Sequence, residues 1–214
     1  MLEKSPLFAT LDAEILQFLE QGTVVSFCPK NTYILNQGEA SSNLYMVLEG
    51  RVKVFVANDD GREMTLDYLS ANETFGELAL LDGETRSANV MTVEETKVAM
   101  LSRQHFLACL SSSPSVAINM MKILATRLRS MTNQIENLAL LDVYGRIARE
   151  LLKQSTELPD GSRVTCELTH QEIANLVGSS REMVTKILLD LKRGGYIDSD
   201  HRRIVIRGKL PARW

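Results

Sequence analysis

A long segment without helix-breaking residues is the feature that most constrains the fold of this chain. From Pro114 to Asp142 there is no internal glycine or proline. Apolar residues recur there at alternating spacings of three and four, at Met121, Leu124, Leu128, Met131, Ile135 and Leu138. This repeat is typical of a two-stranded coiled coil and is narrower than the apolar stripe of a helix packed on its own domain. We therefore predict a long helix that pairs two chains into a homodimer; the alternative is a helix packed on its own domain.

The residues before this helix have the pattern of a small antiparallel β domain. A short helical segment, LDAEILQFLEQG, comes first. Segments rich in Val, Tyr, Thr and Met follow: VVSFCPK, TYILNQGE, LYMVLEGRVKVFVAND, EMTLDYLS and ANVMTVEETKVAMLS. Gly and Asn clusters separate them, and NDDG is a hairpin-turn signal. Many short strands with frequent turns predict an antiparallel barrel or sandwich.

The residues after the helix contain four short predicted elements. These are the helices YGRIARELLKQS, LTHQEIANLVG and REMVTKILLDLKRGG and a final hairpin, YIDSDHRRIVIRG. Thr169 stands three residues before Glu172, the register of a helix capping box. The tight turn at Val177–Ser179, with Gly178 suited to a left-handed backbone, joins two of the helices. A helix, a tight turn and a second helix predict a helix-turn-helix motif.

The second helix of this motif has two distinct faces. If Ile187, Leu188 and Leu191 face the core, the opposite face presents Arg181, Glu182, Thr185 and Lys186. The first turns of this helix enter the DNA major groove, where Arg pairs with guanine and a carboxylate accepts from cytosine. The same pattern would also fit a solvated helix face with an i,i+4 ion pair.

Further basic and polar residues extend the predicted DNA-binding surface. Ser180, near the helix N-terminus, is expected to bond a phosphate, and Arg202 and Arg203 are expected to contact the DNA backbone from the hairpin tip. The net charge of the whole chain is −3. Residues 1–138 nevertheless hold 11 basic against 17 acidic residues, net −6, and residues 139–214 hold 13 against 10, net +3. An acidic first part and a basic second part fit a sensor joined to a polyanion-binding module.

An acid, a base and a bare glycine lie close together in FGELALLDGETRSA. Gly76 directly precedes Glu77, and Arg86 directly precedes Ser87. Two explanations fit this arrangement: a structural salt bridge between Glu77 and Arg86, or a small polar ligand that these residues bind. An anion held by backbone N–H groups and one Arg is physically reasonable.

From about residue 6 to residue 208 the chain resembles the CRP/FNR family of transcription regulators, and most closely its cAMP-receptor branch. FGELALL…TRSA resembles the phosphate-binding cassette of that family, NLALLDVYGRIA its hinge, and LTHQEIANLVGSSREMVTKIL its helix-turn-helix. The resemblance implies an α+β fold with three parts. These are a jelly-roll-like, cyclic-nucleotide-binding β-barrel over 1–110, a long coiled-coil dimerisation helix over 111–141, and a winged helix-turn-helix domain over 142–214.

The resemblance also assigns roles to the residues of the cassette. Arg86 is expected to hold the cyclic phosphate, a bidentate task that suits a guanidinium. Glu77 is expected to accept the ribose 2′-hydroxyl, and Gly76 to let the backbone approach the ligand. Ser87 would donate a hydroxyl to the phosphate, and Leu78 belongs to the same site.

The long helix contributes to this site as well. Arg127 matches a residue that reaches back toward the ligand, and Thr132 matches one that contacts the base from the partner subunit. Met131 stands where relatives that respond to cAMP usually carry Thr, and Asp67 stands where they carry a short hydroxyl residue. A carboxylate accepts from the N1 and N2 groups of guanine, so a guanine cyclic nucleotide, including cyclic di-GMP, remains an alternative ligand to cAMP.

The resemblance implies a homodimeric bacterial regulator that binds a cyclic nucleotide and then a palindromic, TGTGA-like operator in double-stranded DNA. RNA polymerase is a further implied partner, and a ligand-independent regulator is the alternative. The implied DNA-binding residues are His170, Gln171, Ser180, Arg181, Glu182, Thr185, Lys186 and Arg202.

Several other classes of protein are not expected. Cys28, Cys109 and Cys166 are far apart, no CxxC is present, and His105, His170 and His201 are isolated, so no metal site is predicted. We find no P-loop and no nucleophile–base pair, so we expect no enzyme and no cofactor beyond the allosteric ligand. Without an apolar leader or membrane-length run, we expect a cytoplasmic protein with no membrane partner.

Overall fold

The structure is a computed structural model that describes residues 1–200 and 202–211. The predictions for His201 and for residues 212–214 therefore lie outside the described residues. The chain divides into two compact units, Met1–Ser130 and Met131–Trp214. The predicted domain boundaries at 110/111 and 141/142 remain predictions.

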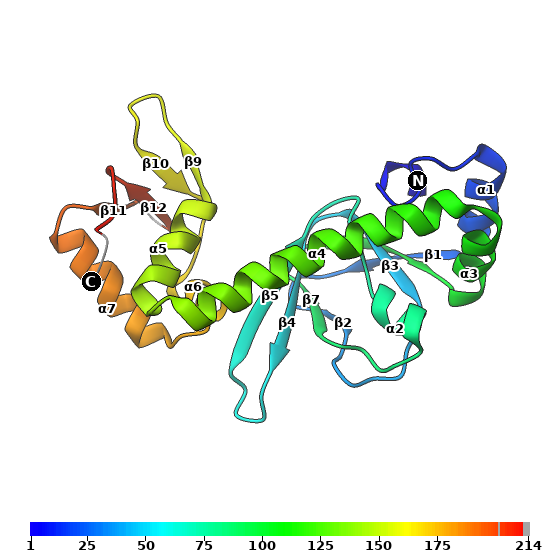
Figure 1. The fold of residues 1–214 in the computed structure, drawn as a ribbon, viewed down its shortest axis with the longest axis horizontal. Coiled ribbons are helices and arrows are strands. Elements are labelled where there is room, and N and C mark those ends of the chain that lie inside the picture. The colour runs from blue at the N-terminus through cyan, green and yellow to red at the C-terminus, as the bar shows by residue number, and fades with distance from the viewer. Residues whose placement is uncertain (201, 212–214) are drawn as a thin grey trace. The chain divides into compact units, whose positions relative to one another are not determined.

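Two four-stranded antiparallel sheets form the first unit (Figure 1). One has the order β1-β8-β3-β6, with β1 at Thr23–Cys28, β8 at Thr96–Leu101, β3 at Leu44–Glu49 and β6 at Thr74–Phe75. The other has the order β2-β7-β4-β5, with β2 at Tyr33–Leu35, β7 at Asn89–Thr92, β4 at Val52–Ala57 and β5 at Glu63–Leu69. Val47 and Phe75 of the first sheet share a core with Val52 and Val90 of the second. The predicted antiparallel, jelly-roll-like domain is confirmed, as two packed sheets.

Helices pack on the outside of the two packed sheets. They are η1 (Leu2–Lys4), α1 (Ala13–Gln21), α3 (Arg103–Ser112) and the first part of α4 (Pro114–Leu140). Phe8, Phe106, Val116 and Met120 are buried together in their core. A short helix, α2 (Glu77–Asp82), lies inside FGELALLDG and was not predicted. Its six residues are too few to show helical periodicity, and they stand between two glycines with left-handed backbone.

The long helix predicted from the apolar repeat is confirmed as α4, and most of that repeat faces outward. Met121 is 60% exposed, and Leu128 and Ile135 are each 66% exposed, whereas Leu124 packs partly on the core of the first unit. The helix ends at Leu140, before Asp142, because the Asp142 carboxylate caps the next helix by accepting from the Gly145 N–H at 2.7 Å.

No single membrane-spanning helix and no metal-ion cluster is found among the described residues. No single helix there has the length and apolar content to cross a membrane, although α3 and α4 pass that test as a pair bent by 112°. No group of three or more His, Cys, Asp or Glu side chains in the described ranges is arranged to hold a metal ion.

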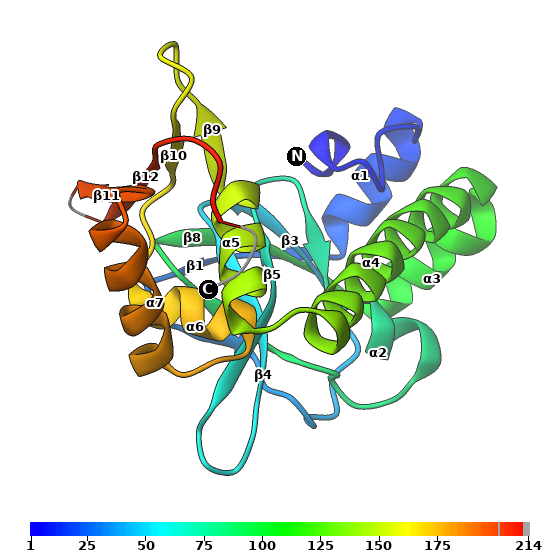
Figure 2. The same cartoon turned by 60° about the vertical axis from the view of Figure 1, so that its left-hand side comes forward.

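The second unit combines three helices with a four-stranded sheet (Figure 2). The helices are α5 (Val143–Lys153), α6 (His170–Val177) and α7 (Arg181–Arg193). The sheet has the order β11-β12-β10-β9, with β11 at Ile197–Asp200, β12 at Arg203–Ile206, β10 at Arg163–Thr165 and β9 at Ser155–Glu157. The three helices and the final hairpin are the predicted ones. The β9–β10 hairpin was missed, because strands of three residues carry too little alternation to be distinguished from a loop.

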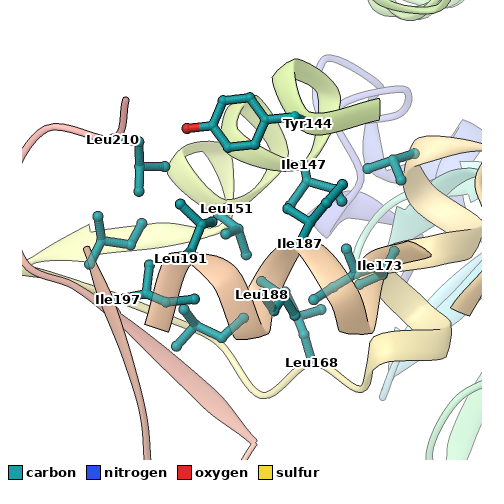
Figure 3. Close-up of a cluster of buried hydrophobic side chains, with 14 of the residues drawn as sticks. Tyr144, Ile147, Leu151, Leu168, Ile173, Ile187, Leu188, Leu191, Ile197 and Leu210 are labelled. Carbon is teal, nitrogen blue, oxygen red and sulfur yellow. The ribbon is translucent and has the colours of Figure 1, made fainter. Parts of the chain in front are cut away.

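One continuous apolar core holds this unit together (Figure 3). Ile147 and Leu151 of α5 meet Ile187 and Leu191 of α7, and all four are fully or almost fully buried. Leu188 of the same helix is 6% exposed, as predicted for the inward stripe, whereas its neighbour Leu189 is 49% exposed. The face of α7 opposite the core is thereby directed to solvent.

This orientation of α7 is tested by truncating two adjacent leucines. We expect Leu188→Ala to lower the free energy of unfolding of the second unit by about 2–4 kcal/mol, because it leaves a cavity in the core. Leu189→Ala, which makes the same chemical change on the exposed face, is expected to cost less than about 1 kcal/mol. Differential scanning calorimetry measures both, and equal losses would show that α7 is turned differently.

Candidate ligand site and DNA-binding surface

Arg86 is a buried guanidinium whose hydrogen bonds go only to neutral oxygens. The residue is 3% exposed. Its Nη1 donates to the Gly76 carbonyl at 2.6 Å, and its Nη2 donates to the Ser41 hydroxyl at 2.8 Å and to the Asn43 carbonyl at 2.9 Å. Among the described residues no carboxylate lies within ion-pair distance of Arg86, and its buried Nε–H has no acceptor. The side chain therefore has donors to spare and no direct counter-charge.

The electrostatics of Arg86 follow from this burial. Desolvation lowers the pKa of Arg86, and Tyr45, Glu77 and Glu39 partly oppose that effect from a distance. An arginine carries five N–H donors and remains charged in proteins, and only three hydrogen bonds are made here. A buried charge without a partner is unfavourable. The environment is thus suited to receive an anion.

The chain around Arg86 is held by backbone hydrogen bonds. The Gly38 N–H donates to the Arg86 carbonyl at 2.8 Å, and the Arg86 N–H donates to the Glu39 carbonyl at 3.0 Å. With the bonds to Ser41 and Asn43, the segment between β2 and β3 contacts both the backbone and the side chain of Arg86. This fixes where the guanidinium lies.

Gly76 is required by its contacts as well as by its backbone. Its φ is 81°, in the left-handed region. A Cβ at this position would lie 2.7 Å from Arg86 Nη1 and 3.1 Å from the Asn43 carbonyl oxygen. A side chain here would therefore displace the guanidinium. Leu78 and Ser87, the other predicted residues of the cassette, are exposed.

Glu77 forms an ion pair with Arg127 and not with Arg86. Glu77 is 4% exposed, and its Oε1 lies 2.6 Å from Arg127 Nη1. Arg127 Nη2 also donates to the Thr74 carbonyl. The alternative of a structural Glu77–Arg86 salt bridge is therefore wrong, because the acid is paired with α4. The structure does bring Glu77 and Arg127 together, as the family resemblance implied.

A hollow of about 340 Å³ lies beside this ion pair. Arg127, Lys122 and Ser130 of α4 line one side of it, and Asp67 of β5 and Thr74 line another. One Asp67 oxygen accepts from the Tyr68 N–H at 2.9 Å, which leaves the other for a ligand. Met131 and Thr132 follow on α4 and are both exposed.

The helix-turn-helix motif is built by its caps. The Thr169 hydroxyl oxygen accepts from the Glu172 N–H, and the Glu172 carboxylate accepts from the Thr169 N–H at 2.6 Å, so the predicted capping box is present. Gly178 ends α6 with a φ of 62°, and the Ser180 hydroxyl then caps α7 by accepting from the Met183 N–H at 3.2 Å. These caps define the turn between α6 and α7.

The first turns of α7 present exposed charged side chains. Arg181, Glu182 and Lys186 are exposed. Hydrogen bonds from its own backbone N–H and then from the Ser180 hydroxyl lower the pKa of Glu182, with a smaller contribution from Arg181. Glu182 is thereby kept as a carboxylate, which accepts hydrogen bonds and donates none.

A contact between α6 and α7 was not foreseen in the sequence. His170 Nδ1 lies 2.8 Å from the Thr185 hydroxyl, and that hydroxyl donates its proton to the Arg181 carbonyl at 2.9 Å. Since the single hydroxyl proton is used, Thr185 accepts from His170, and we assign the proton to Nδ1. The residues are 15 positions apart, and no local pattern predicts such a pair.

The remaining predicted DNA-binding residues lie at exposed positions. The Gln171 amide donates to the Asn175 side-chain oxygen at 2.8 Å. The Arg202 carbonyl accepts from the Leu168 N–H at 2.9 Å, and its side chain is exposed at the turn before β12. Arg203, in β12, lies 3.9 Å from a Glu167 carboxylate oxygen.

Comparison with known proteins gives independent evidence on both units. A family model for the cyclic nucleotide-binding domain matches residues 25–113, and one for the Crp-like helix-turn-helix domain matches residues 145–209. The cAMP-activated global transcriptional regulator CRP of Pasteurella multocida is 34% identical over 205 residues, which cover 93% of this chain and 97% of that protein. The CRP-like cAMP-activated global transcriptional regulator of Mycobacterium tuberculosis is 32% identical over 182 residues, which cover 83% of this chain and 81% of that protein.

A solved structure shows the same fold. The c-di-GMP responsive global regulator CLP of Xanthomonas campestris superposes with a TM-score of 0.80 at 27% identity, over 92% of this chain and 100% of that chain. The two domains occur in the order expected from the sequence, and the two regulators match over 81% and 97% of their lengths. This chain therefore belongs to the CRP/FNR family of transcription regulators.

Proposed function

We propose that this chain acts as a homodimer that binds cAMP at Arg86 and Glu77. With cAMP bound, the homodimer holds two copies of α7 on a palindromic operator. The observation that carries the proposal is the Arg86 guanidinium, which is buried and lacks a direct counter-charge in the described residues. Two relatives named as cAMP-activated regulators support cAMP as the ligand.

The ligand chemistry matches the donors and acceptors of the site. A cyclic phosphate carries one negative charge, and the unused N–H groups of Arg86 can form charge-assisted hydrogen bonds to it. Glu77 has a second carboxylate oxygen besides the one that pairs with Arg127, and this oxygen can accept the ribose 2′-hydroxyl. The ligand would thus neutralise the buried positive charge.

The ion pair between Glu77 and Arg127 offers a route from the ligand to the dimer. Arg127 belongs to α4, whose exposed apolar repeat is suited to pair with a second copy. A ligand shifts the arrangement of two such helices only by binding one arrangement more tightly than the other. The favoured arrangement would set the two α7 helices about 34 Å apart, the spacing of successive major-groove half-sites.

We expect the cyclic nucleotide to be released intact, because the family consists of regulators and Glu77 is held in an ion pair. We place its action in the bacterial cytoplasm, where operator DNA is found, and we keep RNA polymerase as a proposed partner.

The ligand site is tested by Arg86→Leu. This change removes the buried guanidinium proposed to hold the phosphate, so we expect cAMP affinity to fall at least about 100-fold. Isothermal titration calorimetry measures that loss, and a gel shift on a TGTGA palindrome measures the accompanying loss of cAMP-dependent DNA binding. Arg62→Gln, an exposed cation in the β4–β5 turn, is the matched control and should leave both unchanged. Undiminished cAMP affinity in a folded Arg86→Leu protein would reject the site.

The DNA-binding surface is tested by comparing Arg181→Ala with Arg202→Ala. If Arg181 reads a base, its loss should cost about 1–3 kcal/mol and relax the preference at one operator position. If Arg202 contacts a phosphate, its loss should weaken binding to all DNA sequences alike. It should also reduce the slope of log affinity against log salt concentration by about one. Affinities for an operator and its single-base variants at several salt concentrations separate the two effects. A uniform loss in the Arg181 variant would make that residue a phosphate contact.

A guanine cyclic nucleotide is a second candidate ligand, and the position of Asp67 favours it. The Asp67 carboxylate lines the hollow beside Arg127 and keeps one oxygen available. Two parallel bonds from guanine N1 and N2 suit a carboxylate, whereas the Watson–Crick edge of adenine offers it one donor group. The structural relative from Xanthomonas campestris is described as responsive to c-di-GMP.

Asp67→Ser tests which base the site prefers. If Asp67 binds guanine, the variant should shift the ratio of cAMP to cGMP affinity toward cAMP by about tenfold, because a charged acceptor is lost. Titration of cAMP, cGMP and cyclic di-GMP into both proteins gives the ratio directly. An unchanged ratio would assign Asp67 no role in choosing the base.

A further inference from the structure

Ser41 contacts the anion-binding guanidinium from outside the phosphate-binding cassette. It lies in the segment between β2 and β3 and is half-buried. Its Oγ accepts from Arg86 Nη2 at 2.8 Å, and the two residues are 45 positions apart. Neither the cassette pattern nor the family resemblance pointed to this residue.

The hydrogen-bond capacity of Ser41 is only half used. A serine hydroxyl has one proton to donate and two lone pairs to accept with. Here the oxygen accepts from Arg86, so its own O–H must point away from the guanidinium. Within the described ranges that O–H has no acceptor, and neither does the buried Arg86 Nε–H. Two donors, one neutral and one charged, are thus left without acceptors around the same guanidinium.

We propose that Ser41 is a direct phosphate ligand, which donates its hydroxyl proton to one exocyclic oxygen of the cyclic nucleotide while still accepting from Arg86. This inference rests on the proposed ligand site at Arg86. Both protons of Arg86 Nη2 are donated to Ser41 and Asn43, so the unused N–H groups of Arg86 belong to Nη1 and Nε. An anion that accepts from them lies against the same guanidinium that the Ser41 hydroxyl contacts.

The backbone of this segment prepares Ser41 for that role. The Gly38 N–H and the Glu39 carbonyl are both bonded to the backbone of Arg86. The segment that carries Ser41 is therefore tied to the same residue as its side chain. A donor held in place before the ligand arrives loses little freedom on binding.

The proposal is tested with Ser41→Ala and with Ser42→Ala as its matched control. Ser42 is the adjacent serine, also half-buried, and its side chain makes no hydrogen bond within the described ranges. We expect Ser41→Ala to weaken cAMP binding about tenfold, as for the loss of a hydrogen bond to a charged group, and Ser42→Ala to leave it unchanged. Calorimetry on the full-length chain provides the affinities, and circular dichroism checks the fold.

Phosphorothioate analogues of cAMP distinguish a direct contact between Ser41 and the phosphate from a role of Ser41 in positioning Arg86. The Rp and Sp diastereomers of adenosine 3′,5′-cyclic phosphorothioate each carry sulfur, a weaker acceptor, in place of one exocyclic oxygen of cAMP. If Ser41 donates to one of these oxygens, the loss caused by Ser41→Ala should shrink for one diastereomer and persist for the other. An equal loss for cAMP and both diastereomers would overturn direct contact and leave Ser41 as a positioning residue for Arg86.

Comparing Ser41→Ala with Arg86→Leu distinguishes a failure of the Ser41 role from a failure of the proposed ligand site. Unchanged cAMP binding in Ser41→Ala, with binding lost in Arg86→Leu, would reject the role of Ser41 and retain the site. Binding that survives both changes would reject both.

Discussion

The structure depends on one unpaired charge: the guanidinium of Arg86 is enclosed by protein and bonded only to neutral oxygens. Charges in such places are normally matched by a carboxylate, because desolvation is otherwise unfavourable. Here the nearby acid, Glu77, is committed to Arg127. The desolvated guanidinium thus lowers the free energy of unfolding of the first unit, and under the proposed function an anionic ligand would offset that loss on binding. This is how a preorganised site gains affinity.

The ion pair of Glu77 with Arg127 offers a route by which ligand binding at this site could affect α4. Arg127 is bonded both to Glu77 and to the Thr74 carbonyl, so α4 is tied to the cassette and to the strand before it by one side chain. A ligand that competes for Glu77 changes the electrostatic balance at Arg127. Because α4 also carries the exposed apolar repeat, the same helix takes part in both the proposed ligand binding and the proposed pairing. Coupling of this kind needs a differential affinity between two arrangements and no further contact.

Local patterns predicted much of the molecule, and contacts across the fold were the part they missed. The 3.5-residue repeat predicted α4, the Thr169–Glu172 spacing predicted a capping box, and Leu188 with its neighbours predicted the inward face of α7. Helix α2 and the β9–β10 hairpin were missed because each is shorter than the window in which periodicity can be recognised. The choice between Arg86 and Arg127 as partner of Glu77 was beyond sequence reasoning as well. Both arginines were expected at the site, and only the packing of α4 on the cassette decides which one is in contact.

The charges around α7 also explain how a chain with a net charge of −3 is suited to recognise a polyanion. Attraction to phosphate needs only local cations, and Arg181, Lys186 and Arg202 are exposed. Glu182 is a carboxylate acceptor on the same surface, and under the proposed function it would repel phosphate while accepting from base amino groups. A surface that mixes donors with acceptors gives up non-specific affinity and gains discrimination between sequences. An acidic protein that must ignore most DNA and hold one operator is favoured by that balance.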